Sequence, residues 1–351
     1  MRGLKVLWVM ALLPCISGCV SVADFSPDGT RVAIGTPSGM ALQEVGSGEV
    51  QLVGPREPCL APSWSPDGRH LAFYALDAAR TASTPGRLHL HDLTTGRTTA
   101  MPAGFRPPFA WREDGLRFVC RYERDGVGRW VWYNLVESGI TQENREAPEP
   151  ITPDNTSVAY VAGTDGIVLL GFDRNLYHIE GNETHRITTT GDVIGMRVSP
   201  DGRAVTWVRK GPNTRFILAS VYRYDLRSRT VRKLPFPFRV GAINPNPRRA
   251  PRSIDSAAIS PRGQRLAITV TYAGERGASS RAAYVMALNG TGARLVHRSA
   301  PSREPGVDLR MAWAPDGTHL VVTEVLGKRT VTRLYRGDGT PIRVASTATW
   351  P

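Results

Sequence analysis

The chain lacks several residue patterns on which whole classes of protein depend. It has four cysteines and no Cys-x-x-Cys pair, which excludes a redox or zinc site built on such a pair. No G-x-S-x-G, H-E-x-x-H or phosphate-binding P-loop motif occurs, so no linear motif points to hydrolase, zinc-protease or nucleotide chemistry. No long amphipathic helix is apparent, and the apolar run Val6 to Leu13 is too short to span a bilayer.

Lysine is also scarce, since only four of the 44 basic residues are lysine and 40 are arginine. We attribute this skew to a genome rich in G and C rather than to a binding function. The net charge is nevertheless +13, and a basic surface favours anionic partners such as phospholipid head groups or cell-wall polymers. No aromatic RNA-binding motif accompanies the charge, so we expect no nucleic-acid partner.

Residues 1–18 have the pattern of a bacterial lipoprotein signal peptide. Arg2 and Lys5 provide positive charge, an apolar stretch follows, and Ile16-Ser17-Gly18 precedes Cys19 as in a lipobox. We therefore expect Cys19 to be lipidated and to anchor the protein outside the cytoplasm, with ordinary secretion as the alternative. No aspartate directly follows Cys19, which favours the outer membrane, facing the periplasm, if the host has two membranes.

One short phrase, a polar turn between two apolar runs, occurs seven times. The copies are FSPDGTRVAIG around Asp28, WSPDGRHLAFY around Asp67, WREDGLRFVCR around Asp114, ITPDNTSVAYV around Asp154, VSPDGRAVTWV around Asp201, ISPRGQRLAIT around Arg262 and WAPDGTHLVVT around Asp316. A repeat of this period is typical of a solenoid or a propeller. Seven copies leave no stretch long enough for a separate catalytic domain.

The centre of each phrase has the chemistry of a β-hairpin turn. Proline presets the first corner, aspartate bonds to its own backbone, and glycine or asparagine accepts a positive φ. We therefore expect structural rather than catalytic roles for the turn residues Asp28, Gly29, Asp67, Gly68, Asp114, Gly115, Asp154, Asn155, Asp201, Gly202, Gly263, Asp316 and Gly317. Arg262 replaces the aspartate in the sixth copy, which keeps its proline and glycine.

A second hairpin follows each phrase, as in LHLHDLTTGRTTAM and VYRYDLRSRTVRKL. Two hairpins give four strands, which is one propeller blade. The sequence thus predicts an all-β fold, a single seven-bladed β-propeller over residues 19–351 with four antiparallel strands per blade. The expected blades are approximately 20–53, 60–101, 108–143, 149–190, 193–234, 254–298 and 309–346. The last blade has four strands of its own, so we expect the ring to close without strand exchange.

The seven phrases resemble the WD40-like repeats of the TolB-type β-propeller family, whose signature is a W/F-S-P-D-G turn followed by an apolar strand. The resemblance covers nearly all of the chain after the leader and implies the propeller fold. No segment matches the N-terminal α/β domain of TolB itself. Trp64, Trp111 and Trp313 precede the turn where the family packs blade against blade, so we expect them in the core.

Two cysteines could form a disulfide, and two histidines could bind a metal ion. Cys59 and Cys120 fall on the same rim of adjacent blades; export permits a disulfide, but we expect two buried free thiols. His89 and His91 lie two apart in an expected strand and could form part of a metal site, but no third ligand is evident. We expect no metal and no cofactor.

The longer connections of all blades fall on one face, where binding residues concentrate. The most distinctive connection is 235–252, in which aromatic and basic residues alternate with prolines and no acidic residue occurs. Its candidate binding residues are Phe236, Phe238, Arg239, Arg248, Arg249 and Arg252. A solvated connector is the alternative. The first strand begins on this same face, about five residues after Cys19 and therefore within ~17 Å of it. We expect the lipid to hold this face toward the membrane.

Together these patterns predict a monomeric, lipid-anchored propeller of the cell envelope. We expect a non-catalytic protein-binding or scaffolding module whose partner is an envelope protein or an anionic cell-wall or lipid polymer. One alternative is a propeller-type hydrolase or lyase with its site at the central channel. Another is a carbohydrate-binding or sensor lipoprotein.

Overall fold

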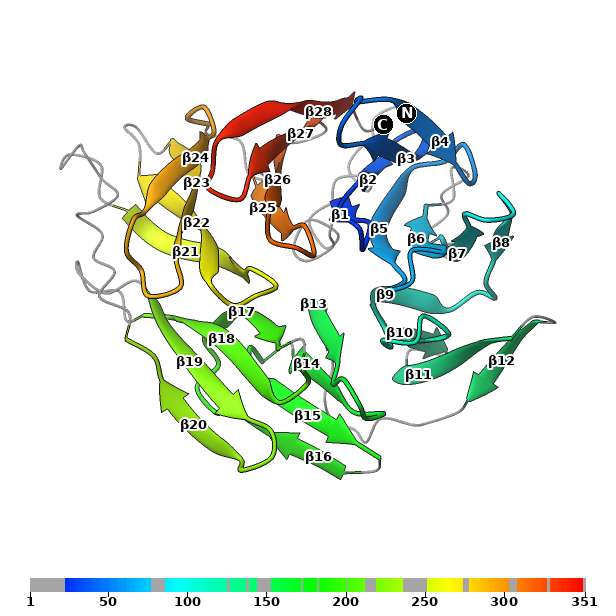
Figure 1. Ribbon diagram of the computed structural model, residues 1–351, viewed down its shortest axis with the longest axis horizontal. Coiled ribbons are helices and arrows are strands. Elements are labelled where there is room, and N and C mark those ends of the chain that lie inside the picture. Colours follow the sequence, from blue (N-terminus) through cyan, green and yellow to red (C-terminus); the bar gives the residue numbers. More distant parts are fainter. Residues whose placement is uncertain are drawn as a thin grey trace, which may run out of the picture.

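The structure, a computed structural model, is a ring of seven four-stranded antiparallel sheets (Figure 1). It describes residues 23–76, 86–124, 127–136, 139–143, 153–171, 173–181, 183–199, 201–211, 219–235, 251–273, 278–302, 308–326 and 329–349. The predicted fold class, a seven-bladed β-propeller with four antiparallel strands per blade, is confirmed. Within these ranges, no helix is long and apolar enough to cross a membrane.

Each blade consists of four consecutive strands. Blade 1 holds β1 (Ala23–Phe25), β2 (Arg31–Thr36), β3 (Gly39–Glu44) and β4 (Val50–Val53). Blade 2 holds β5 (Cys59–Trp64), β6 (His70–Ala75), β7 (Arg87–Asp92) and β8 (Thr98–Ala100). Blade 3 holds β9 (Phe105–Trp111), β10 (Arg117–Arg124), β11 (Val127–Val136) and β12 (Gly139–Glu143). Blade 4 holds β13 (Pro153–Tyr160), β14 (Ile167–Gly171), β15 (Leu176–Glu180) and β16 (Glu183–Arg186).

The other three blades repeat this arrangement. Blade 5 holds β17 (Val193–Val198), β18 (Ala204–Lys210), β19 (Ala219–Asp225) and β20 (Thr230–Lys233). Blade 6 holds β21 (Pro251–Ile259), β22 (Arg265–Ala273), β23 (Ser279–Ala287) and β24 (Arg294–Arg298). Blade 7 holds β25 (Asp308–Trp313), β26 (His319–Leu326), β27 (Arg329–Arg336) and β28 (Pro341–Thr349). The first strand of each blade is innermost and the fourth is outermost (Figure 1).

The ring closes between blades 7 and 1 through side-chain contacts, without a shared strand. Every sheet is made of consecutive strands, so the two end blades share none, as the sequence predicted. An apolar cluster joins Phe25 and Ile34 of blade 1 to Val321 and Leu334 of blade 7. Six further clusters lie at the other six blade interfaces, and the core is therefore distributed around the ring.

The Ser-Pro-Asp-Gly turns connect the first and second strands through a compact side-chain network. In blade 1, Ser26 Oγ donates to Asp28 Oδ1 at 2.5 Å, and Asp28 Oδ1 also accepts the backbone N–H of Thr30 at 3.0 Å. Gly29 has a φ of +71°, a conformation that favours glycine. Positive φ recurs at Gly68, Gly115, Gly202, Gly263 and Gly317. Asp67, Asp114, Asp201 and Asp316 accept backbone N–H bonds in the same way as Asp28.

Blade 4 differs from the prediction. Asp154 and Asn155 lie in β13, so the turn predicted there was wrong; the turn between β13 and β14 is at 161–166 instead. The N–H of Val161 donates to the carbonyl of Gly166 at 2.9 Å, and Gly163 has a φ of +77°. The reason is burial, because the second strand of a blade has neighbours on both sides, and the Ile167–Gly171 run is buried throughout.

Three tryptophans link neighbouring blades, and Trp64, Trp111 and Trp313 are all buried as expected. Each indole N–H donates to a backbone carbonyl in the first strand of the preceding blade. The acceptors are Asp24 at 3.2 Å, Ser63 at 3.1 Å and Ala258 at 3.0 Å, respectively.

Cys59 and Cys120 are buried free thiols, which confirms that expectation. Burial raises the pKa of Cys59 to about 12 and also raises the pKa of Cys120. Both thiols therefore stay protonated at neutral pH and unreactive.

Candidate functional site

The segments predicted to bind and to anchor lie almost wholly outside the described residues. This is the case for the leader 1–18, for Cys19, and for Phe236, Phe238, Arg239, Arg248 and Arg249. Only the backbone of Arg252 is described, in β21. Their roles stay predictions.

The candidate site lies instead on the opposite face of the ring. In four consecutive antiparallel strands, the 1–2 and 3–4 turns share one face, here called the short-turn face. The 2–3 connections and the links between blades share the other, the long-loop face. On the short-turn face, a pocket of about 470 Å³ opens between blades 6 and 7.

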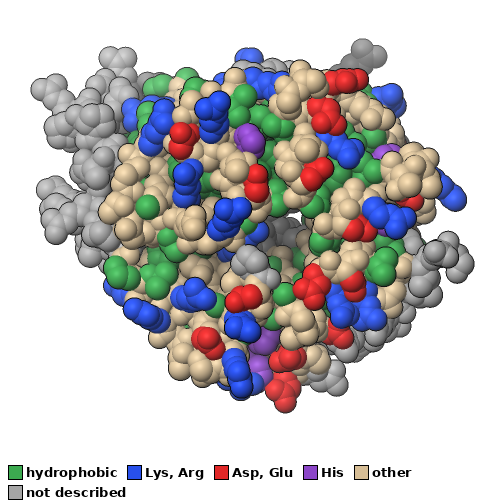
Figure 2. Space-filling model, viewed as in Figure 1, with side chains coloured by type: hydrophobic (Ala, Val, Ile, Leu, Met, Phe, Trp, Pro, Cys, Tyr) green, Lys and Arg blue, Asp and Glu red, His purple; other side chains and the backbone are tan. Residues whose placement is uncertain are grey.

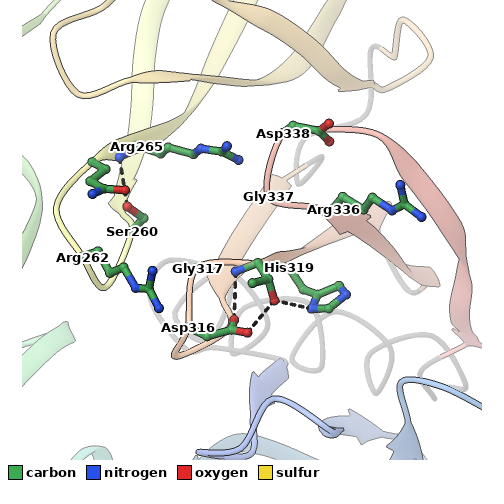
Figure 3. Close-up of a pocket in the computed structure, with 11 residues that line it drawn as sticks. Ser260, Arg262, Arg265, Asp316, Gly317, His319, Arg336, Gly337 and Asp338 are labelled. Carbon is green, nitrogen blue, oxygen red and sulfur yellow. Dashed lines mark hydrogen bonds between the residues drawn. The ribbon is translucent and has the colours of Figure 1, made fainter.

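Three turns build this pocket (Figure 3). The 1–2 turn of blade 6, the 1–2 turn of blade 7 and the 3–4 turn of blade 7 surround it. Its lining residues are Ser260, Arg262, Gln264, Arg265, Asp316, Gly317, Thr318, His319, Arg336, Gly337 and Asp338. Arg262 and Arg265 extend from blade 6 toward the turns of blade 7, whereas the guanidinium group of Arg336 points away from them (Figure 3).

Arg262 occupies the position at which other blades carry the turn aspartate. Ser260 still bonds within its turn, since its Oγ accepts the N–H of Arg265 at 2.9 Å. The turn therefore folds without the carboxylate, and the substitution frees an exposed side chain at the pocket. It also replaces a negative charge with a positive one.

Arg336 is a second basic residue at a position where other blades carry an acidic one. Its backbone N–H donates to the carbonyl of Thr340 at 2.8 Å, closing the 3–4 turn. Glu44 and Asp92 close the equivalent turns of blades 1 and 2 with the same bond. At this position too, an arginine borders the pocket where blades 1 and 2 carry an acid.

The arginines of the pocket are available to a ligand. Within the described part of the chain, no hydrogen bond or salt bridge engages the guanidinium groups of Arg262, Arg265 or Arg336. All three side chains are exposed. Arginine presents a planar fork of donors that matches carboxylate and phosphate groups, so this pocket is suited to an oxyanion.

The two carboxylates of the pocket are engaged in their own turns. Asp316 accepts the N–H and the hydroxyl of Thr318 at 2.8 and 2.6 Å, and Asp338 accepts the N–H of Thr340 at 2.8 Å. Burial opposes ionisation of Asp316, but these hydrogen bonds outweigh it and lower its pKa. The bond from Thr340 likewise lowers the pKa of Asp338. Both groups are ionised at neutral pH, so the pocket has mixed charge with an arginine excess.

The histidines considered as metal ligands have other contacts. His89 stacks on Phe73 with ring centroids 5.6 Å apart, and His91 Nδ1 bonds to the hydroxyl of Thr98 at 2.8 Å. Among the residues that the structure describes, no group of three or more His, Cys, Asp or Glu side chains could hold a metal ion.

Sequence reasoning noticed Arg262 but treated it only as a turn variant, and it did not single out Arg265 or Arg336. Comparing the seven repeats of the chain with one another would have pointed to the pocket. Arg262 departs toward the opposite charge from the five blades whose 1–2 turn carries an aspartate, and such a departure marks a place where the ring is not symmetric.

Comparison with known proteins supports the propeller fold but assigns neither a family nor a function. No family model matches the chain, and no curated protein is detectably similar in sequence. Among solved structures, an oligogalacturonate lyase from Vibrio parahaemolyticus shares 11% identity with a TM-score of 0.57, covering 87% of each chain. The β-propeller domain of Myceliophteria thermophila Cps50 (Swd1) shares 16% identity with a TM-score of 0.55, covering 88% of this chain and 93% of that one.

TolB from Acinetobacter baumannii is a more distant structural match, with 14% identity and a TM-score of 0.44. The match covers 94% of this chain but 65% of TolB, so the chain spans less than two thirds of that protein. At these identities the matches show the propeller fold alone, which enzymes and non-enzymes share.

Proposed function

We propose that this protein is a lipid-anchored, non-catalytic binding module of the bacterial envelope that holds an anionic partner at the pocket between blades 6 and 7. The observation that supports this proposal is the pair of unpaired guanidinium groups, Arg262 and Arg265, that extend across the pocket (Figure 3). Arg262 stands where the repeat elsewhere uses an acid, which favours a role beyond the fold.

The ligand class follows from the size and charge of the pocket. A volume of about 470 Å³ is in the range of small-molecule sites, and it would hold one or two units of a polymer. Figure 2 shows basic side chains spread among acidic ones over one face, and the net charge of +13 would attract an acidic chain from a distance. The partner is then an anionic cell-wall or lipid polymer, or an envelope protein with an acidic segment, bound by a monomer.

The proposed anchor would orient this pocket. β1 begins at Ala23 on the long-loop face, four residues after Cys19, so a lipid there would lie within ~14 Å of that face. The short-turn face, with the pocket, would then point away from the membrane and toward the envelope space.

The binding proposal is tested by titrating the purified protein with three probes: poly(glycerol phosphate), polygalacturonate and neutral dextran. We expect one of the two anionic polymers to bind, and Arg262→Asp to weaken that binding by about tenfold or more through loss of a charge-assisted hydrogen bond. Arg262→Asp restores the residue that other blades carry, so the turn should fold.

The matched control is Arg69→Asp, which makes the same charge change at an exposed position on the same face of blade 2. It should change the affinity by no more than about twofold, because charges beyond a Debye length are screened. Equal losses in the two variants, or no binding to either anionic polymer, would contradict a pocket-specific site.

The anchor is tested separately in bacterial cells by labelling with an alkyne fatty acid. We expect label on the wild type and none on Cys19→Ser. If the wild type carries no label, the proposed lipid anchor is contradicted, while the binding proposal is unaffected. The two alternatives, a propeller-type hydrolase or lyase and a carbohydrate-binding or sensor lipoprotein, stay predictions. Release of shortened products from a bound polymer would favour the enzyme, and equal binding of neutral dextran would favour the carbohydrate-binding protein.

A further inference from the structure

One position beside the 3–4 turn carries an aliphatic residue in most blades, and blade 7 carries glycine there. The N–H of the residue at this position donates to the carbonyl just before the second strand, as Gly337 does to Thr318 at 2.6 Å. The residues that make the same bond in five other blades, at 2.6 to 2.9 Å, are Val45, Leu93, Leu135, Leu226 and Leu288. In blade 4 the residue at the matching register is Glu180. Glycine at this position is therefore a departure specific to blade 7.

The five aliphatic side chains fill space between blades. Each is partly buried and packs against the apolar cluster between its own blade and the preceding one. The cluster between blades 6 and 7 receives no such side chain, because this part of blade 7 reads Gly337-Asp338-Gly339-Thr340. Gly337 lines the pocket between blades 6 and 7. The pocket therefore lies where five other interfaces hold an aliphatic group.

Arg265 uses part of the room beside Gly337. A Cβ added to Gly337 would lie 3.1 Å from Nη1 of Arg265 and 2.4 Å from the carbonyl oxygen of Gly317. Figure 3 shows the side chain of Arg265 extending from blade 6 toward the turns of blade 7. Any side chain at position 337 would press on the 1–2 turn and crowd this guanidinium group. Glycine is what allows the guanidinium group to reach this place.

The residue that opens the second strand has a different contact in other blades. The guanidinium carbon of Arg31 lies 5.6 Å from the ring centroid of Trp64, and His70 stacks on the tryptophan of blade 3 with centroids 6.2 Å apart. Each aromatic ring belongs to the next blade, so the equivalent partner of Arg265 would be Trp313. Within the described part of the chain Arg265 makes no such ring contact. Its guanidinium group serves the pocket instead.

The pocket thus combines two features that no other interface of the described residues shares. An aliphatic group is missing, and the guanidinium groups of Arg265 and Arg262 border the space, without an ion pair among the described residues. The first feature leaves room for methylene groups, and the second calls for a carboxylate, which a guanidinium group binds through two parallel hydrogen bonds. A ligand that uses both is an acid carried on a short aliphatic arm.

We propose that the pocket holds a glutamate side chain from an acidic segment of an envelope protein, with its methylene groups in the room of the missing aliphatic side chain and its carboxylate on Arg265 and Arg262. This inference rests on the proposed function and narrows the partner to an acidic peptide segment. Glutamate has an arm about as long as that of leucine, whereas aspartate is one methylene shorter. A uronate carries its acid directly on a sugar ring, and poly(glycerol phosphate) carries its charge within the chain. The rest of the pocket, about 470 Å³ in all, takes the neighbouring peptide residues.

The test is a titration of the purified protein with hexaglutamate, hexaaspartate and hexagalacturonate at one ionic strength. Each unit of the three probes carries one carboxylate, so long-range attraction by the basic protein is similar for all of them. We expect hexaglutamate to bind at least about tenfold more tightly than the other two, because its carboxylate reaches both guanidinium groups. Equal affinity for hexaaspartate would overturn the glutamate site. Tightest binding of hexagalacturonate would assign the pocket to a uronate polymer and overturn the peptide ligand.

Arg265→Ala should weaken the binding of hexaglutamate by about tenfold or more, through loss of a charge-assisted contact. Arg31→Ala is the matched control, since Arg31 has the same place in the repeat of blade 1 but lies over Trp64. It should change the affinity by no more than about twofold, because distant charges are screened. Equal losses in the two variants would show that the arginines act through net charge alone and would overturn the site.

Gly337→Leu gives blade 7 the residue that four other blades carry, and it should abolish the preference for hexaglutamate over hexaaspartate. Circular dichroism shows whether this variant folds, since its Cβ would press on the carbonyl of Gly317. If it does not fold, the comparison of Arg265→Ala with Arg31→Ala decides the test. A folded Gly337→Leu variant that keeps the full preference would overturn the role of the missing side chain.

The proposed function and this narrower inference fail in different ways. If an anionic polymer binds in a manner that depends on Arg262, but hexaglutamate binds no better than hexaaspartate, the proposed function stands and the glutamate site is overturned. If none of the anionic probes binds, both are overturned.

Discussion

At the residue scale, single side chains connect one blade to the next. The indoles of Trp64, Trp111 and Trp313 each donate to a carbonyl across a blade interface, which fixes the angle between successive sheets. The three accepting residues also pair with the second strand of their own blade, so each indole bond is added to the ladder of the sheet. Trp207 is buried without a partner for its indole N–H within the described residues, so its role is packing alone.

Trp313→Phe should lower the free energy of unfolding by about 2 kcal/mol, because the bond from the indole to the carbonyl of Ala258 is lost together with packing volume. Trp207→Phe is the control, since it removes similar volume and no hydrogen bond, and should cost about 1 kcal/mol. Urea denaturation followed by circular dichroism measures both. Equal costs would show that the indole bond contributes nothing.

A second prediction at this scale concerns Glu324 of β26, which is buried beside His297 and Arg333. Burial alone would raise its pKa, but hydrogen bonds from His297 at 3.0 Å and Arg333 at 3.1 Å outweigh that effect and lower it. A lowered pKa means that the ionised group stabilises the fold above the ordinary carboxyl pKa, and that this contribution is lost as the pH falls through the lowered value.

Glu324→Gln should therefore lower the free energy of unfolding at pH 7 by about 2 kcal/mol. The difference from wild type should shrink as the pH falls below the ordinary carboxyl range. Urea denaturation at a series of pH values measures it. A difference that stays constant down to pH 3 would contradict the ionised role.

At the scale of the element, the hairpin turns show how adjacent blades fit together. Gly163 and Gly202 both have positive φ, at +77° and +65°. A Cβ added at Gly163 would meet nothing within 4 Å, whereas one at Gly202 would lie 2.5 Å from the carbonyl oxygen of Ala162. The turn of blade 5 thus packs against the backbone of the blade 4 turn, which lies at 161–166.

These two glycines make a matched pair. Gly163→Ala should cost about 1 kcal/mol, the strain of a left-handed backbone. Gly202→Ala should cost about 3 kcal/mol, since overpacking against backbone is added to the same strain. Thermal or urea denaturation of both variants provides the measurement. If the turn of blade 4 lay at Asp154 and Asn155 instead, Gly202 would have no such neighbour and the two costs would be alike.

At the scale of the whole molecule, closure of the ring is its distinctive property. Six blade interfaces are crossed by the chain, and the seventh, between blades 7 and 1, is held by apolar packing with Arg343 donating to the carbonyl of Glu44 at 2.6 Å. No blade interface has a shared backbone ladder, and this one also lacks a chain connection between its two blades. We expect it to be the first to open.

Leu334→Ala should lower the free energy of unfolding by about 3 kcal/mol and should accelerate hydrogen exchange in β1 and β25 before the rest of the ring. Leu266→Ala, at the interface of blades 5 and 6, is the control with a similar global cost. Exchange by mass spectrometry separates the two. Uniform acceleration around the ring in Leu334→Ala would mean that the fold opens as one unit.

Much of the architecture could be predicted because its causes are local. Proline, aspartate and glycine at short range determine where hairpins form, and the apolar alternation on both sides makes the flanking segments strands. Seven such hairpin pairs can bury their faces only against one another, which requires a ring. The turn of blade 4 was misplaced because two turn-like segments compete there, and the burial of β14 decides between them.

The sequence by itself determined the strand order, the number of blades, the burial of the tryptophans and the self-contained last blade. Only the tertiary structure decided which side chains meet. Arg262 and Arg265 face the turns of a neighbouring blade, the nearest of which lies more than 50 residues further along the chain. Turn chemistry acts over a few residues, whereas these encounters depend on the register and curvature of the closed ring, which no short segment encodes.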